Sequence, residues 1–267
     1  MYPPNSSKFQ LSYQEPYQWS ALLHFLSLHL FAGVESISEN HYRRHGEGWQ
    51  VTVSHQAGKL LVETAGPAPP DTQARVRHLF DLFAPIQEIE NHLSQFPNLG
   101  IHAHPGLRLP GCWDSFELVI RAILGQHVSV KGATTLSARL VERFGPPTAR
   151  SLADADVAVI GLTKSRAASI RAIAQAVLDG TVDLHDAASL EAVKGIGPWT
   201  AQYALMRTAH SADAFPASDL VLMKNTGHSN PRSLAAAAAA WRPYRAYAAM
   251  HIWQRGLTTQ IDLCNYS

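Results

Sequence analysis

The spacing of apolar residues changes along this chain, and that change restricts the folds open to it. In the first 90 residues, apolar and polar positions alternate at Trp49, Val51 and Val53, which is the period of a β-strand. After Asp114, apolar residues recur every three or four positions, as in amphipathic helices. The pattern predicts a sheet-containing N-terminal unit followed by a helical body.

The N-terminal unit is predicted to combine strands with helices. Glycine-containing segments at 46–48 and 56–58 are typical of turns between antiparallel strands. The leucine- and phenylalanine-rich stretch 16–31 reads as a helix, and Asp71 is placed to cap a second helix running to Phe83. We therefore predict an α+β domain over residues 1–90, with an antiparallel sheet and helices.

The region after Asp114 carries successive helix signals. Asp114 and Glu117 have the spacing of a capping box, and Ser129 is placed to cap the next helix. Further helices are predicted over 163–178, 189–193, 198–210, 219–225, 231–241 and 243–255. The chain from 91 to 267 is thus expected to be a mostly α-helical body.

Composition excludes several classes of protein. The two cysteines, Cys112 and Cys264, form no Cys-x-x-Cys pair, which argues against an iron–sulfur cluster. No apolar run reaches the length of a membrane span, and residues 1–10 lack a signal core, so a cytoplasmic protein is expected. The net charge of +1 is weak support for a nucleic-acid partner, although basic residues exceed acidic ones over residues 112–267.

One segment points to chemistry, the run Val193-Lys194-Gly195-Ile196-Gly197-Pro198-Trp199-Thr200-Ala201. Its two glycines allow a sharp turn and a close approach of the backbone to a ligand. Pro198 suits the first position of a helix, whose free N–H groups would bind a phosphate. An ordinary tight turn between two helices is the alternative interpretation.

The ordered motifs resemble a known family. The hairpin, followed by Phe215-Pro216-Ala217-Ser218-Asp219, resembles the helix-hairpin-helix (HhH-GPD) DNA glycosylase superfamily. Segments 107–112, 121–126, 128–130, 241–245 and 251–253 resemble its bacterial 3-methyladenine DNA glycosylase II type, the AlkA type. The resemblance implies a two-part helical body, with residues 112–225 containing the hairpin and residues 91–111 plus 226–267 forming the second part.

The resemblance also implies a function. It indicates a monomeric enzyme that hydrolyses the N-glycosidic bond of alkylated or otherwise damaged purines in duplex DNA. Asp219 would be the catalytic carboxylate, although a helix N-cap is the common role of such an aspartate. Relatives that also cleave the DNA strand have a lysine at the position of Trp199, so the tryptophan favours a monofunctional enzyme.

Further site residues follow from the same resemblance. Trp199, Tyr203 and Trp253 would line the base pocket, with core packing as the alternative. The expected DNA-binding residues are Gln126, His127, Lys194, Gly195, Gly197 and Thr200. His127 stands where the AlkA type has the leucine that fills the gap left by the flipped base. No cofactor is expected, apart from a monovalent cation held by the backbone carbonyls of Glu191, Val193 and Ile196.

Two other functions remain open at this point. The first is a glycosylase/lyase acting on oxidised bases, against which Trp199 argues. The second is a non-catalytic protein that uses the hairpin only to bind DNA. Asp219 and the aromatic set argue against it, because binding alone requires neither.

Overall fold

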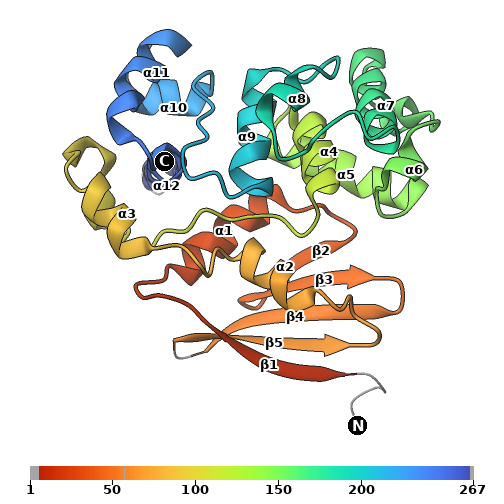
Figure 1. The fold of residues 1–267 in the computed structure, drawn as a ribbon, viewed down its shortest axis with the longest axis horizontal. Helices are drawn as coiled ribbons and strands as arrows, with labels where there is room; N and C mark the ends of the chain where they lie inside the picture. Colours follow the sequence, from red (N-terminus) through yellow and green to blue (C-terminus); the bar gives the residue numbers. More distant parts are fainter. Residues whose placement is uncertain (1–5, 57, 265–267) are drawn as a thin grey trace.

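The computed structural model describes residues 6–56 and 58–264, with side chains described as far as residue 256. Figure 1 shows a sheet at one end of the molecule and a larger helical body above it. The predicted order, an α+β unit followed by helices, is confirmed. The strands are β1 (Ser7–Ser12), β2 (Glu35–Ser38), β3 (His41–Gly46), β4 (Trp49–Gln56) and β5 (Lys59–Ala65).

The sheet is antiparallel throughout, with the strand order β1-β5-β4-β3-β2. The predicted turn at 46–48 joins β3 to β4, where Gly46 lies opposite Trp49. The alternation seen in the sequence places Val51 and Val53 on the inner face, where both are fully buried. Val62 of β5 lies directly opposite Val53 and completes this apolar face.

The helices of the described residues account for the rest of the fold. They are α1 (Trp19–His29), α2 (Thr72–Leu79), α3 (Ile86–Leu93), α4 (Ser115–Gly125), α5 (Val130–Phe144), α6 (Ala149–Leu152), α7 (Lys164–Leu178), α8 (Ala187–Glu191), α9 (Pro198–Thr208), α10 (Leu220–Thr226), α11 (Pro231–Ala238) and α12 (Arg245–Cys264). Short 3₁₀ turns lie at Pro97–Leu99, Ile101–Ala103, Val157–Ile160 and Ala239–Trp241.

Two of the predicted caps are present, but the capping box is not. The side chains of Asp114 and Ser129 accept the backbone N–H groups of Glu117 and Gly132. The Glu117 carboxylate does not return to the start of α4. It instead accepts two hydrogen bonds from Arg44 of β3, at 2.7 and 2.6 Å. A buried guanidinium is a stronger partner for a carboxylate than a backbone N–H, so the predicted box was wrong.

The predicted helix from Asp71 to Phe83 is shorter than expected. The helix α2 ends at Leu79, and Asp81 takes a left-handed conformation with φ of 52°. Its carboxylate accepts hydrogen bonds from the Leu109 N–H and the Tyr247 hydroxyl, both far along the chain. These distant partners stop the helix, and local sequence cannot reveal them.

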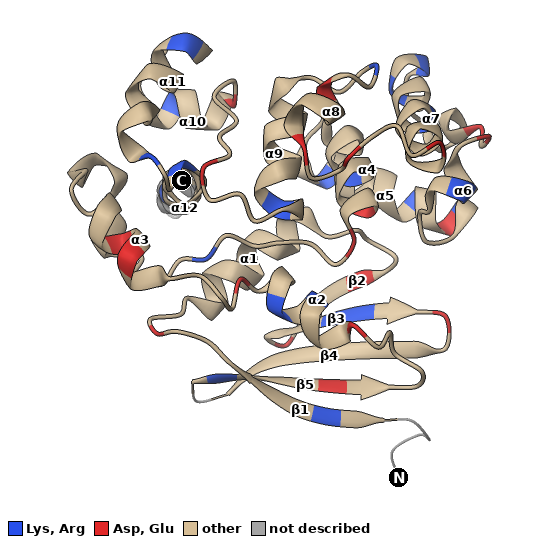
Figure 2. Ribbon diagram, in the orientation of Figure 1, with Lys and Arg blue, Asp and Glu red and all other residues tan. Residues whose placement is uncertain are grey.

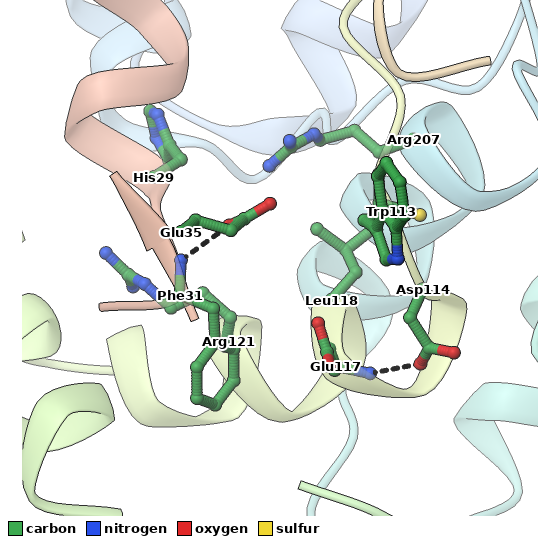
Figure 3. Close-up of a pocket in the computed structure, with 10 residues that line it drawn as sticks. His29, Phe31, Glu35, Trp113, Asp114, Glu117, Leu118, Arg121 and Arg207 are labelled. Atoms are coloured by element: carbon green, nitrogen blue, oxygen red, sulfur yellow. Dashed lines mark hydrogen bonds between the residues drawn. The ribbon is translucent and has the colours of Figure 1, made fainter. Parts of the chain in front are cut away.

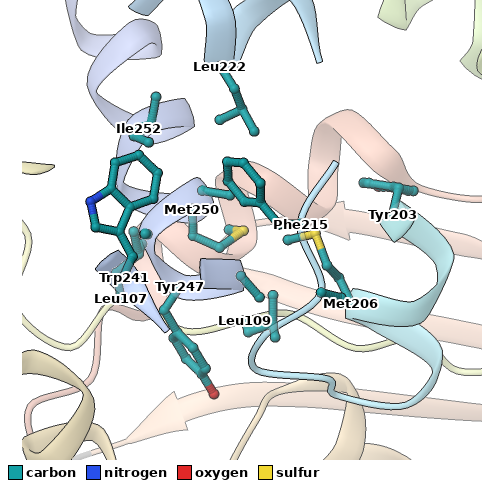
Figure 4. Close-up of a cluster of buried hydrophobic side chains, with 14 of the residues drawn as sticks. Leu107, Leu109, Tyr203, Met206, Phe215, Leu222, Trp241, Tyr247, Met250 and Ile252 are labelled. Carbon is teal, nitrogen blue, oxygen red and sulfur yellow. The ribbon is translucent and has the colours of Figure 1, made fainter. Parts of the chain in front are cut away.

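The helical body has two groups of helices, with α1 beneath both (Figure 1). One group contains α4 to α9, and the other contains α3 and α10 to α12. Phe25 of α1 shares a buried cluster with the second group and with the segment around Leu107 and Leu109. Figure 4 shows this cluster, in which Tyr203 and Met206 of α9 meet Phe215, Leu222 and Met250. The two groups therefore meet at α9, α10 and α12.

The charged residues of the helical body are spread over its outer helices. Figure 2 shows Lys and Arg on α6, α7, α10 and α11 and in the turn after α8. Among the described helices, none combines the length and hydropathy needed to span a membrane. The same part of the chain contains no group of three or more His, Cys, Asp or Glu side chains arranged to hold a metal ion.

Candidate active site

Asp219 lies at the junction of the two helix groups, immediately before α10. Its Oδ1 accepts the backbone N–H of Leu222 at 2.8 Å, which makes it the N-cap of that helix. Oδ1 also accepts the indole N–H of Trp253 at 3.1 Å, and Oδ2 accepts that of Trp199 at 2.9 Å. Three N–H groups from three elements thus fix the orientation of one carboxylate.

The three predicted pocket residues come together around this carboxylate. Trp199 and Tyr203 lie one turn apart on α9, and their rings stack with centroids 5.1 Å apart and planes within 6°. The Trp253 ring of α12 stands edge-on to Tyr203 at 6.5 Å. Tyr203 is buried, whereas Trp199 and Trp253 are partly exposed. The result is an aromatic wall that begins at Asp219 and continues inward.

Two further residues of this aromatic cluster come from the N-terminal unit, and sequence reasoning missed them. The ring centroid of Phe25, on α1, lies 6.3 Å from that of Trp253. The ring centroid of His29 lies 4.2 Å from that of Phe25 and 6.2 Å from that of Tyr203. They stand four residues apart and so share one face of the helix. This spacing in the sequence indicates that Phe25 and His29 share one helix face, but it does not identify the helices that the face contacts.

A buried arginine connects the aromatic cluster to the extended segment before α4. Arg207 of α9 donates to the Tyr203 hydroxyl at 2.9 Å and to the carbonyls of Pro110 and Gly111 at 3.1 and 2.7 Å. Its guanidinium also lies 5.4 Å from the centre of the Phe25 ring. Since carbonyl and hydroxyl oxygens satisfy its N–H groups, Arg207 holds the inner wall of the cluster in place.

The hairpin is formed by α8, a glycine turn and α9. Gly195 has a φ of +93°, and a Cβ on it would lie 1.8 Å from the hydroxyl oxygen of Ser169. Gly197 has an ordinary φ of −93°, and a Cβ there would meet no atom within 4 Å. Ile196 between them is buried. Gly195 is therefore needed for the turn itself, whereas the space beside Gly197 is open.

The loop between α4 and α5 lies next to the hairpin. Gln126 donates its side-chain N–H to Thr200 Oγ1 at 3.1 Å and to the Gly195 carbonyl at 3.3 Å. The next residue, His127, is exposed and takes a left-handed conformation with φ of 56°. Thr200 is buried, whereas Lys194 is exposed in the turn. The predicted DNA-binding residues are thus neighbours, with Gln126 joining the loop to the hairpin.

Comparison with known families divides the chain in two. Residues 8–114 match the model of the AlkA N-terminal domain. Residues 120–228 match the model described as HhH-GPD superfamily base excision DNA repair protein. The second match contains the hairpin, Asp219 and α10.

Whole-chain comparisons agree with this division. DNA-3-methyladenine glycosylase 2 of Escherichia coli (strain K12) is 34% identical over 275 residues, which cover 92% of this chain and 96% of that protein. MBOgg1, solved with a low-affinity DNA ligand, superposes with a TM-score of 0.80 at 18% identity, over 95% of this chain and 96% of its own. The 3-methyladenine DNA-glycosylase from Archaeoglobus fulgidus gives 0.76 at 19%, over 92% and 98%. The chain belongs to the HhH-GPD superfamily of base excision DNA repair proteins, with an AlkA N-terminal domain.

Proposed function

We propose that this protein is a monofunctional DNA glycosylase that releases alkylated purines from duplex DNA. The observation that carries the proposal is the Asp219 carboxylate, held by the indole N–H groups of Trp199 and Trp253 within an aromatic cluster. The similarity to DNA-3-methyladenine glycosylase 2 supports the alkylated class of substrate.

The proposed reaction uses the negative charge of Asp219. Breaking the bond between C1′ and the base nitrogen leaves its electron pair on the base and positive charge on the sugar. A fixed carboxylate beside C1′ stabilises that charge without reorganisation. Water then bonds to C1′ and loses a proton, with Asp219 placed to accept it. The products are a free base and an abasic site.

Aromatic rings suit the proposed substrate. A base in duplex DNA must leave the stack before C1′ can be attacked. Many alkylated purines carry a positive charge, and a cation over an aromatic face is stabilised by about 0.5–2 kcal/mol. Trp199 and Trp253 are the partly exposed rings at Asp219 and are proposed to receive the base.

The hairpin and the neighbouring loop are proposed to hold the DNA. The open space beside Gly197 and the start of α9 suit the approach of a phosphate to backbone N–H groups. His127, exposed at the tip of its loop, is proposed to fill the gap left by the flipped base.

A monovalent cation is proposed to sit beside the hairpin when DNA is bound, held by the carbonyls of Glu191, Val193 and Ile196. The Val193 carbonyl accepts the Ile196 N–H at 3.1 Å. A carbonyl oxygen has two lone pairs, so it retains one for a cation. Such an ion would supply positive charge to a nearby phosphate.

The decisive experiment measures base release from duplexes that each carry one defined lesion. Wild-type protein should release methylated purines and leave the abasic strand uncut, and borohydride should trap no protein–DNA adduct. Asp219→Asn keeps the N-cap, because asparagine caps as well as aspartate, but it removes the charge. We expect base release to become slower because the activation free energy rises by about 3–4 kcal/mol, as for loss of a fixed transition-state partner. An Asp219→Asn variant with wild-type turnover would refute the proposal.

A further inference from the structure

We propose that Arg207 is a positioning residue for the reaction, which holds the Tyr203 hydroxyl and, through the Tyr203 ring, the two tryptophans that orient Asp219. This inference rests on the proposed function and adds a residue to that same site. The guanidinium acts from behind the aromatic rings, without contact to the base or the sugar.

The ring of Tyr203 contacts both indoles that donate to Asp219. It stacks on Trp199, with ring centroids 5.1 Å apart and planes at 6°, and it stands edge-on to Trp253, with centroids 6.5 Å apart. Trp199 donates to Oδ2 of Asp219, and Trp253 donates to Oδ1. A shift of the Tyr203 ring therefore changes the direction of both N–H groups and, with them, the orientation of the carboxylate.

Arg207 holds this ring from the same face of α9. Trp199, Tyr203 and Arg207 follow one another at intervals of four residues, the spacing that brings side chains together on a helix. Arg207 donates through Nη1 to the Tyr203 hydroxyl at 2.9 Å, and its Cζ lies 5.7 Å from the centre of that ring. Among the residues that the structure describes, the hydroxyl has no other hydrogen-bond partner. Arg207 therefore fixes the hydroxyl end of the Tyr203 ring.

The position of Arg207 is itself fixed by the N-terminal part of the chain. Its Nε and Nη2 donate to the carbonyls of Pro110 and Gly111, at 3.1 and 2.7 Å. The Gly111 N–H in turn donates to the carbonyl of Leu79 in α2, at 3.1 Å. His78 of α2 lies with its Nε2 3.0 Å from the Arg207 carbonyl, which can only accept, so this nitrogen donates. Both the side chain and the backbone of Arg207 are thus tied to α2 and to the segment before α4.

The surroundings of Arg207 leave no room for a base. Arg207 is 4% exposed and, together with His29 and Arg121, lines a cavity of about 20 Å³ between α1 and α4. Figure 3 shows the Arg207 side chain extending over this space. A cavity of this volume accommodates about one water molecule, so neither a purine nor a sugar reaches the guanidinium there. Arg207 therefore affects the reaction through the residues that it holds.

The test is a double-mutant cycle in base release. Tyr203→Phe removes the hydroxyl that Arg207 holds and keeps the ring, whereas Arg207→Met removes the guanidinium. Each change should lower kcat about tenfold, as for loss of one hydrogen bond, with KM nearly unchanged, because Asp219 loses orientation only. The double variant should also lose about tenfold, since both changes break the same link, whereas independent effects would multiply to about a hundredfold loss.

Arg108→Met is the matched control. Arg108 is also buried, and its guanidinium lies 4.8 Å from the centre of the Tyr17 ring, which packs against the core of the N-terminal unit. It also donates to backbone carbonyls, those of Gln14, Pro16 and Ala84. Arg108→Met should lower the free energy of unfolding and leave kcat unchanged, because this arginine holds no residue of the Asp219 cluster.

Three results would overturn the role of Arg207. They are an unchanged kcat in Tyr203→Phe, a rise in KM alone in either single variant, and a hundredfold loss of kcat in the double variant. Tyr203→Phe decides the matter by itself if Arg207→Met does not fold, because it removes a single oxygen atom. Wild-type protein that releases no base removes the proposed function together with this inference. Normal release by wild type and by both single variants removes only the role of Arg207.

Discussion

The carboxylate of Asp219 caps a helix and is also the group proposed to act in the reaction. Oδ1 caps α10 through the Leu222 N–H, while both oxygens accept indole N–H groups. The two interpretations that the sequence left open, N-cap and catalytic acid residue, are therefore compatible in geometry. Capping fixes the side-chain rotamer, so in the proposed reaction the charge is in place before a base enters.

The indole of Trp253 offers a test of this positioning. Trp253→Phe keeps an aromatic ring against Phe25 and Tyr203 but removes the N–H that Asp219 accepts. A hydrogen bond to a charged group contributes about 1.5–3 kcal/mol. We expect kcat to fall at least tenfold with little change in KM, measured under single-turnover and steady-state conditions. A variant with unchanged kcat would show that Asp219 needs no orientation from Trp253.

The sequence identifies the site residues that lie close to the hairpin motif, but it does not identify those that lie far from the motif along the chain. Trp199, Tyr203 and Asp219 follow one another over a short stretch, and the structure brings them together. Phe25 and His29 precede them by far in the chain. Their contacts depend on how α1 docks under the helical body, and no local pattern encodes that docking.

At the scale of elements, the hairpin contains two glycines with different requirements. Gly195 needs its positive φ and the close contact with Ser169 of α7. Gly197 needs neither within the protein, because its φ is ordinary and the space beside it is open. The sequence predicts both glycines as parts of one motif. Their different roles become visible only in the packing of α7 against the turn.

This difference predicts opposite outcomes for two alanine variants. Gly195→Ala should lower the free energy of unfolding by more than about 1 kcal/mol, because it combines strain with a clash. Gly197→Ala should leave unfolding unchanged but weaken binding to damaged and undamaged duplexes alike. Denaturant unfolding and DNA titration at two salt concentrations measure these effects. Equal DNA affinity of Gly197→Ala and wild type would remove the hairpin as the phosphate anchor.

At the scale of the whole molecule, buried histidines link stability to pH. His251 of α12 is buried, and burial, followed by the charge of His104, lowers its pKa to about 4. The unfolded value is about 6.5. Its contribution to stability is present above pH 6.5 and is lost as the pH falls toward 4, because the unfolded chain binds the proton first.

Removing this histidine should flatten the pH profile. In His251→Leu, the slope of the unfolding free energy between pH 4.5 and 6 should be smaller than in wild type by up to about 1.4 kcal/mol per pH unit. Urea unfolding at several pH values measures this slope. His24→Leu, at an exposed site, is the control. Parallel profiles for wild type and His251→Leu would contradict the buried neutral state of His251.

The two units of the molecule are also joined by ion pairing that local sequence does not reveal. Arg44 of β3 and Glu117 of α4 are 5% and 8% exposed and share two hydrogen bonds. The sequence predicts a sheet unit and a helical body, as observed. It does not predict their docking, because Arg44 and Glu117 come from separate elements and neither carries a pairing motif.

Breaking this pair should be costly, and removing both partners much less so. Arg44→Leu leaves Glu117 buried without its partner, and we expect a loss of about 3–5 kcal/mol in unfolding free energy. Arg44→Leu combined with Glu117→Leu should recover most of that loss, because no buried charge remains. Lys8→Ala disrupts the more exposed pair with Glu63 and should cost less than about 1 kcal/mol. If Arg44→Leu is no more destabilising than Lys8→Ala, the junction does not depend on this pair.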